Sequence, residues 1–378
     1  MDAPAGEPVE IDKSFVGLPS PVVGRYGPGG HPLQGLWHAP LGHRPTVGFI
    51  ATHYNVDFSE HYLAELMARR GYGFLGWNTR FRGSEEHFLL DHAVAEIGVG
   101  VRWMREVAGI ETIVLLGNSG GGSLMAAYHA QAVAPGLKPT WDLNPLDCID
   151  DLIPGDLFVF VAAHPGRPDI FANWLDAAVN DESDPTAIDP RLDIYNPDNG
   201  PVFEPDFVAE VRAAQQQRSA RITRWCKQEL PTIARHGIRD RLFVVPRVWA
   251  DPRFVDATLD PNRRRPNECY LGDPRRANRG VHGVGQVSTL RTWLSMWSLS
   301  DSQCRAEPHL AHLHVPTLLV EADGDTGVFP SDGDALFDAI AAEDKVRMRR
   351  AGDHYFRTPV GARDRLADAI ADWVDKRV

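Results

Sequence analysis

The sequence predicts an α/β fold built on a mostly parallel sheet. Short apolar runs alternate with helical patterns over residues 46–135, and the same alternation returns after residue 315. Strands that alternate with helices form βαβ units, whose strands lie parallel in one sheet. Hydrophobic residues make up 43% of the chain and charged residues 24%, which is the composition of a folded globular protein.

Each element of this core is predicted from its residue pattern. Apolar runs of five to eight residues predict buried strands, and apolar residues spaced three or four apart predict helices. The predicted strands are 46–52, 73–77, 112–116, 156–163, 316–321 and 345–350. The predicted helices are 62–70, 92–107, 120–133, 334–342 and 362–374. Two early extended segments, 15–23 and 32–38, are expected to form an antiparallel edge.

Between the two parts of the core the pattern changes. Residues 165–205 are rich in Asp, Pro and Asn and are predicted to be loop, like residues 245–285. Residues 206–240 are predicted to form one long helix or a pair, and residues 286–300 carry apolar groups at helical spacing. The chain of 378 residues is longer than one typical domain. We therefore expect a core of residues 1–164 and 306–378, interrupted by an insertion of residues 165–305.

The composition argues against several classes of protein. The net charge of −12 disfavours general nucleic-acid binding, which depends on Lys and Arg. The arginines at 263–265, 275, 276 and 279 are expected to form a solvated loop surface. No apolar run is long enough to span a membrane, and the acidic N-terminus does not resemble a secretory signal. The four cysteines show no metal-site spacing. We expect a cytoplasmic protein without a membrane partner, with a homodimer left open.

The most specific motif is Gly117-Asn118-Ser119-Gly120-Gly121, which lies between a predicted strand and a predicted helix. This is the G-x-S-x-G pattern in the strand–turn–helix context that a nucleophile elbow requires. The turn is so sharp that small neighbours are needed for the strand and helix to approach each other. The motif therefore predicts Ser119 as an exposed nucleophile.

A serine nucleophile needs a base and an orienting acid, and in this architecture they follow in the order Ser, acid, His. The loop after strand 316–321 offers Asp323 and Asp325, and Asp325 is favoured because it lies three residues past the strand-end position Ala322. His354 lies in the loop after the next predicted strand, 345–350, and it alone among 15 histidines follows a late strand in the required order. We predict Asp325 as the acid and His354 as the general base.

With these residues, segments 46–163 and 315–378 resemble the α/β-hydrolase superfamily. The resemblance implies an eight-stranded, mostly parallel sheet, a triad of Ser119, Asp325 and His354, and a largely helical cap inserted after the sixth strand. It also implies that neither a metal nor an organic cofactor is needed. A nucleophilic Ser argues against the dehalogenase and epoxide-hydrolase branches, which place Asp at the elbow, and against the dienelactone branch, which uses Cys.

The resemblance also implies an oxyanion hole. One amide would come from Gly120, and the second from the loop that begins at His53. By position Asn55 would donate it, with Tyr54 as the alternative. Related loops often read His-Gly, whereas Tyr54 here replaces the glycine. The alternative roles are that Tyr54 stacks against the substrate and that His53 only orders the loop.

Further residues are candidates for substrate binding. These are His53, Arg167, Trp293 and Trp297, with Arg167 meeting a substrate carboxylate and the tryptophans lining an apolar pocket or packing the cap. We therefore expect a serine hydrolase, of carboxylesterase or lactonase type, that acts on a hydrophobic small molecule. The alternatives are a C–C bond hydrolase for a ring-fission product of aromatic or steroid breakdown, an acyltransferase, and a non-catalytic binding module.

Overall fold

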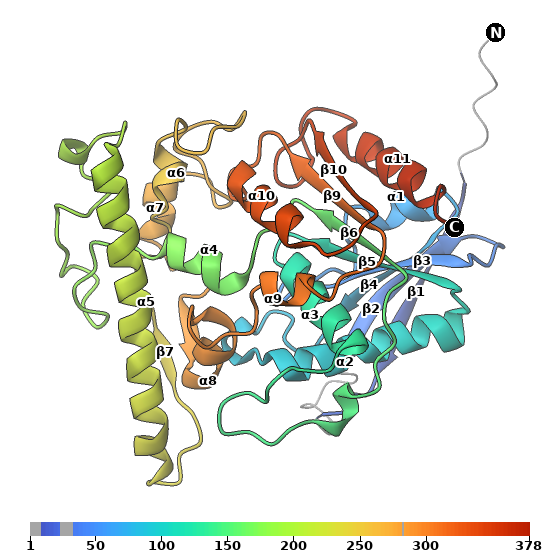
Figure 1. Cartoon of the computed structure of the whole chain (residues 1–378), viewed down its shortest axis with the longest axis horizontal. Helices are drawn as coiled ribbons and strands as arrows, with labels where there is room; N and C mark the ends of the chain where they lie inside the picture. The colour runs from blue at the N-terminus through green and yellow to red at the C-terminus, as the bar shows by residue number, and fades with distance from the viewer. Residues whose placement is uncertain (1–8, 23–32, 282) are drawn as a thin grey trace.

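The computed structural model describes residues 9–22, 33–281 and 283–378, and its centre is an eight-stranded sheet (Figure 1). Its strands are β1 (Ile11–Leu18), β2 (Leu33–Pro40), β3 (Val47–Ala51), β4 (Gly73–Asn78), β5 (Thr112–Asn118), β6 (Leu157–Val161), β9 (Thr317–Ala322) and β10 (Lys345–Arg350). They lie in the order β1-β2-β4-β3-β5-β6-β9-β10. Strands β4, β3, β5, β6, β9 and β10 run parallel, which confirms the predicted class of fold.

The antiparallel edge of the sheet is also present. Strand β1 pairs with β2, and β2 pairs with β4, both in antiparallel register. Strand β1 overlaps the predicted segment 15–23 at residues 15–18, and strand β2 overlaps the predicted segment 32–38 at residues 33–38. Residues 23 and 32 themselves lie outside the described part of the chain.

Helices cover both faces of the sheet because its central strands are apolar on both sides. In β3, Phe49 and Ala51 face α1 (Ala64–Ala68) and α11 (Ala362–Val374), whereas Ile50 faces the opposite core. The helices of the opposite face are α2 (Leu90–Trp103), α3 (Gly121–Val133), α9 (Glu307–Leu310) and α10 (Pro330–Ala339). This two-sided burial explains the continuous apolar runs of the sequence.

Residues 165–305 contribute no strand to the central sheet. They form helices α4 (Arg167–Trp174), α5 (Pro205–Ala234), α6 (Pro252–Val255), α7 (Pro274–Asn278) and α8 (Leu290–Thr292), and the antiparallel strands β7 (Leu242–Val244) and β8 (Val287–Thr289). Figure 1 shows α5 at the end of the molecule far from the sheet. The division into core and cap remains a prediction.

Several predictions within this insertion were wrong. Helices α6 and α7 lie within residues 245–285, where a loop was expected. Residues 167–174 form a helix where a loop was expected, because Pro168 starts a helix whose apolar residues pack against the aromatic cluster around Trp293. Residues 287–289 form a strand where a helix was expected, because they pair with β7. Among the described residues, no helix combines the length and hydropathy that crossing a membrane requires.

Candidate active site

Ser119 lies in the turn between β5 and α3, at the carboxyl edge of the sheet. Its φ is +54°, a left-handed conformation that costs free energy for a residue with a side chain. The neighbouring glycines are required because a side chain at their positions would clash with the backbone. A methyl group on Gly117 would lie 2.6 Å from Gly122 Cα, and one on Gly121 would lie 2.4 Å from the carbonyl oxygen of Thr52. Strand and helix therefore approach as closely as the motif predicts.

The structure brings the predicted base and acid to this serine. His354 Nε2 lies 3.1 Å from Ser119 Oγ, and His354 Nδ1 lies 2.7 Å from Asp325 Oδ2. The other carboxylate oxygen, Asp325 Oδ1, accepts the backbone N–H groups of Gly327 and Val328, each at 2.9 Å. Asp325 and His354 are 1% and 5% exposed, so water competes little for these contacts. This arrangement can fix the tautomer of the imidazole and pass a proton from the hydroxyl.

The competing acid has a different role. Asp323 Oδ1 accepts the backbone N–H of Gly352 at 3.2 Å, and its Oδ2 lies 3.1 Å from Arg263 Nη1. Asp323 thus joins the acid loop to the loop of the base, and Asp325 is the carboxylate that contacts His354.

The predicted oxyanion loop lies beside Gly120. A methyl group built on Gly120 would lie 3.0 Å from His53 Nε2 and 3.3 Å from Tyr54 Cδ2. The Tyr54 hydroxyl is hydrogen-bonded to Ser123 Oγ at 2.9 Å, and its ring packs against Phe88. Burial, with the charge of Arg167, lowers the pKa of His53 well below 6.5. His53 is therefore neutral at pH 7. Which residue donates the second amide of the oxyanion hole, Asn55 or Tyr54, stays a prediction.

Arg167 is buried next to this loop, at the first turn of α4. Its Nη2 donates to Asn55 Oδ1 at 3.2 Å, and its guanidinium carbon lies 4.8 Å from the centre of the Tyr54 ring. The same carbon lies 5.4 Å from the centre of the Trp297 ring. The structure thus places Arg167 and Trp297 together beside the elbow.

Trp293 is held elsewhere. Its Nε1 donates to Thr223 Oγ1 at 2.9 Å, and its ring packs against Phe171 and Phe243. Both tryptophans belong to a short π-helical turn, Trp293–Trp297. Of the two rings, that of Trp297 contacts the guanidinium of Arg167. These contacts are those of a residue that packs the insertion, which was one of the two predicted alternatives.

Tyr270 belongs to the site although no sequence pattern indicated it. Its ring lies 4.3 Å from that of His354, centroid to centroid. Gly327 makes room for this contact, because a methyl group there would lie 1.9 Å from Tyr270 Cζ. Tyr270 comes from an irregular loop, whose path depends on contacts distant in sequence. Glu85 and His164 also interact electrostatically with Arg167, and neither was predicted as a site residue.

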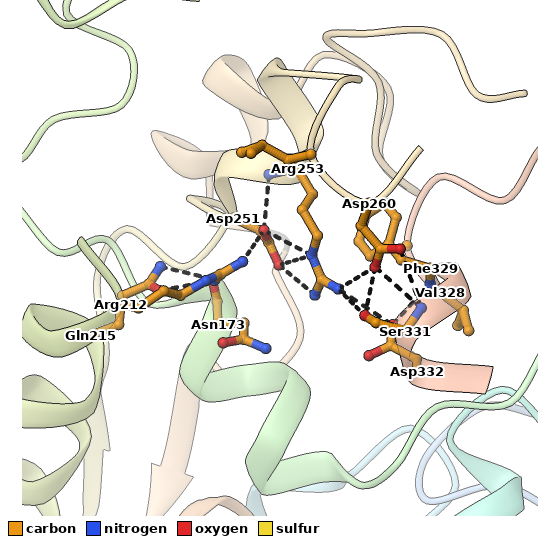
Figure 2. A network of polar contacts seen from close by, with 12 residues as sticks. Asn173, Arg212, Gln215, Asp251, Arg253, Asp260, Val328, Phe329, Ser331 and Asp332 are labelled. Carbon is orange, nitrogen blue, oxygen red and sulfur yellow. Dashed lines mark hydrogen bonds and ion pairs between the residues drawn. The ribbon is translucent and has the colours of Figure 1, made fainter. Parts of the chain in front are cut away.

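A polar network joins the insertion to the loop that carries Asp325 (Figure 2). Asp251 accepts hydrogen bonds from Arg212 at 2.7 Å and from Arg253 at 2.9 Å. Arg253 also reaches Asp332 at 3.7 Å, at the start of α10. In the same segment Asn262 donates to the backbone oxygen of Asp325 at 2.8 Å.

The prediction of a solvated surface was wrong for one arginine of this segment. Arg264 was expected on a solvated surface, but it is 6% exposed. Its guanidinium donates to several backbone carbonyl groups, including Leu259 at 2.6 Å, and lies over the ring of Phe329. Arg263 is exposed, as expected.

Asp332 gives this network a testable pH dependence. Burial raises the pKa of Asp332 to about 6, although Arg253 opposes the shift and Asp251 and Asp260 add to it. A folded-state pKa above the unfolded value contributes stability at low pH that is lost as pH rises through 6. We expect Asp332→Asn to gain about 2 kcal/mol in unfolding free energy relative to the parent between pH 4 and pH 7.

Urea denaturation of both proteins across this range measures the difference. The exposed Asp338→Asn, in the same helix, is the control for the loss of a surface carboxylate. A constant difference between the Asp332→Asn variant and the parent at all pH values would contradict the account.

Comparisons with known proteins place this geometry in a structural context. No protein-family model and no curated protein matches the sequence. Among solved structures, the alpha/beta hydrolase GrgF from Penicillium sp. sh18 covers 97% of this chain and 98% of its own, with a TM-score of 0.53 and 12% identity. DcsB, in complex with its substrate analogue, covers 97% and 99%, with a TM-score of 0.51 and 11% identity. Likeness at these identities shows a shared fold.

Proposed function

Because this chain has the α/β-hydrolase fold, we propose that it is a serine hydrolase that cleaves a carboxylic ester or lactone of a small molecule with a largely apolar body. The nucleophile is Ser119, the general base is His354 and the orienting acid is Asp325. The aromatic residues that the insertion brings to the site, Trp297 and Tyr270, favour an apolar substrate body.

One observation supports this proposal above the others. The hydroxyl, the imidazole and the carboxylate form one continuous line of contacts, at 3.1 Å and 2.7 Å, and the serine in it has a strained backbone. Backbone strain is retained where the surrounding structure enforces it, and such residues cluster at active sites. A protein that only binds a ligand has no need for this strained serine beside a buried His–Asp pair.

The first half of the reaction forms an acyl-enzyme. Ser119 Oγ attacks the carbonyl carbon while its proton moves to His354 Nε2, and the carbonyl oxygen becomes an oxyanion. The N–H of Gly120 and an amide from Tyr54 or Asn55 donate to that oxygen. When the C–O bond to the leaving group breaks, His354 returns the proton to the departing alkoxide.

The second half restores the enzyme. A water molecule gives a proton to His354 Nε2 and attacks the acyl carbon. The bond from that carbon to Ser119 Oγ then breaks, and Ser119 recovers its proton from the imidazolium. The products are a carboxylic acid and an alcohol, or one hydroxy acid from a lactone.

A substrate panel tests the proposal. Parent and Ser119→Ala proteins are assayed with p-nitrophenyl esters, lactones and vinylogous diketones. We expect the parent to turn over esters or lactones and Ser119→Ala to lose at least about 10⁴-fold in kcat, because the covalent step has no nucleophile. Turnover confined to diketones would favour the C–C hydrolase. Equal ester turnover by the two proteins would remove Ser119 from the mechanism.

A further inference from the structure

Arg167 is a buried cation with an unused hydrogen-bond donor next to the nucleophile. The residue is 3% exposed, and its Nε makes no hydrogen bond to any residue that the structure describes. A methyl group built on Gly120, the residue after Ser119, would lie 3.1 Å from this Nε. The unused donor therefore lies beside the residue that follows the nucleophile.

The acid whose charge acts on Arg167 leaves this donor free. Burial lowers the pKa of Arg167, and the negative charge of Glu85 opposes that shift. Among the described residues, however, no ion pair joins the two side chains. Glu85 Oε1 instead accepts the backbone N–H of Gly285 at 2.7 Å, and Glu85 Oε2 has no partner. Glu85 thus balances the charge of Arg167 from a distance without occupying its N–H.

Further buried polar groups of the insertion have no partner among the residues that the structure describes. They are the indole N–H groups of Trp174, Trp249 and Trp297 and the hydroxyl of Tyr270. The stacked rings of Trp174 and Trp249 lie 6.0 Å and 6.2 Å from the ring of Tyr270, which contacts His354. Native proteins leave few buried donors unpaired. A group of unpaired donors is therefore explained by a partner from outside the chain.

We propose that the substrate carries, besides its scissile carbonyl and apolar body, a carboxylate that binds Arg167. The guanidinium supplies a charge-assisted hydrogen bond that a neutral group of the same shape cannot replace. The buried indole and tyrosine donors meet further oxygen atoms of the same molecule. This inference rests on the proposed function. It narrows the substrate to esters or lactones that carry a free carboxylate and further oxygen atoms.

The two histidines beside Arg167 do not add to its positive charge. Burial lowers the pKa of both His53 and His164 well below 6.5, and the charge of Arg167 lowers them further. Both imidazoles are therefore uncharged at pH 7.

A matched pair of esters tests the proposal. p-Nitrophenyl hydrogen glutarate carries a terminal carboxylate, and p-nitrophenyl valerate is a neutral ester of similar length. At constant ionic strength we expect the parent to favour the glutarate by at least about ten-fold in kcat/KM. Arg167→Met should reduce that ratio to near one. The control Arg305→Met removes a partly exposed arginine that pairs with Asp169 at 3.0 Å, and it should keep the ratio.

Two outcomes overturn the proposal. One is a parent without preference for the carboxylate. The other is an equal loss of kcat on both esters in Arg167→Met, which would assign Arg167 to the oxyanion. If the variant does not fold, Arg167→Lys and Arg167→Gln replace it. The preference of the parent for the glutarate ester over the valerate ester tests the proposal even without a variant.

Calorimetry separates this inference from the reaction itself. Glutarate should bind the parent and Ser119→Ala proteins and bind Arg167→Met at least about ten-fold more weakly. If neither ester is hydrolysed but glutarate binds through Arg167, the proposed function fails while the anion site stands. If glutarate does not bind the parent, the anion site is wrong whatever the protein hydrolyses.

Discussion

Asp325→Asn is expected to lower kcat by about 10⁴-fold while leaving the protein folded. Asp325 Oδ2 accepts from His354 Nδ1 at 2.7 Å and so holds the imidazole with Nε2 free to take the serine proton. An amide at this position donates to Nδ1 and stabilises the opposite tautomer, in which Nε2 carries the proton. The loss should appear in kcat, measured with an activated ester, and much less in KM.

The matched control is Asp323→Asn, two residues away in the same loop. It removes the ion pair with Arg263 but leaves the contact between Asp325 and His354 in place. This variant should keep most of the activity. A larger loss in Asp323→Asn than in Asp325→Asn would reverse the assignment of the acid.

Gly117→Ala is expected to destabilise the fold by about 3 kcal/mol, near the upper end of the usual cost of overpacking. The added methyl group would lie 2.6 Å from Gly122 Cα and 3.1 Å from Gly122 N, both backbone atoms that no side-chain rotation can move. Strand β5 and helix α3 must therefore separate, and Ser119 between them must shift. Urea unfolding gives the stability, and ester turnover reports the shift.

Gly136→Ala is the comparison for this effect. A methyl group on Gly136 would have its nearest contact at 3.7 Å, which is ordinary van der Waals distance. We expect a change within about 0.5 kcal/mol there. If Gly117→Ala unfolded at the same urea concentration as the parent, the close packing of the elbow would be disproved.

The core of the fold was predictable because its local patterns and its tertiary structure agree. Helix α11 matches the predicted residues 362–374, and strand β5 extends the predicted 112–116 by only two residues. In both segments the apolar spacing follows directly from burial against one face or two. The insertion was harder, because strand Val287–Thr289 depends on pairing with β7, about 45 residues earlier in the chain.

The candidate site divides in the same way. Ser119, Asp325 and His354 follow strands of a known order, so their positions along the chain indicated that they would meet at one sheet edge. Arg167 was predicted as a substrate contact from its position after β6. Its unpartnered Nε, however, depends on the positions of Asn55 and Glu85, which sequence spacing does not encode.

The central claim is that Ser119 is the nucleophile, and covalent labelling tests it most directly. The folded parent is incubated with a fluorophosphonate probe, its intact mass is measured, and the labelled peptide is identified. The account predicts one adduct per chain, on Ser119, and none on the Ser119→Ala variant. No adduct on the folded parent, or an adduct on another residue that persists in Ser119→Ala, would contradict it.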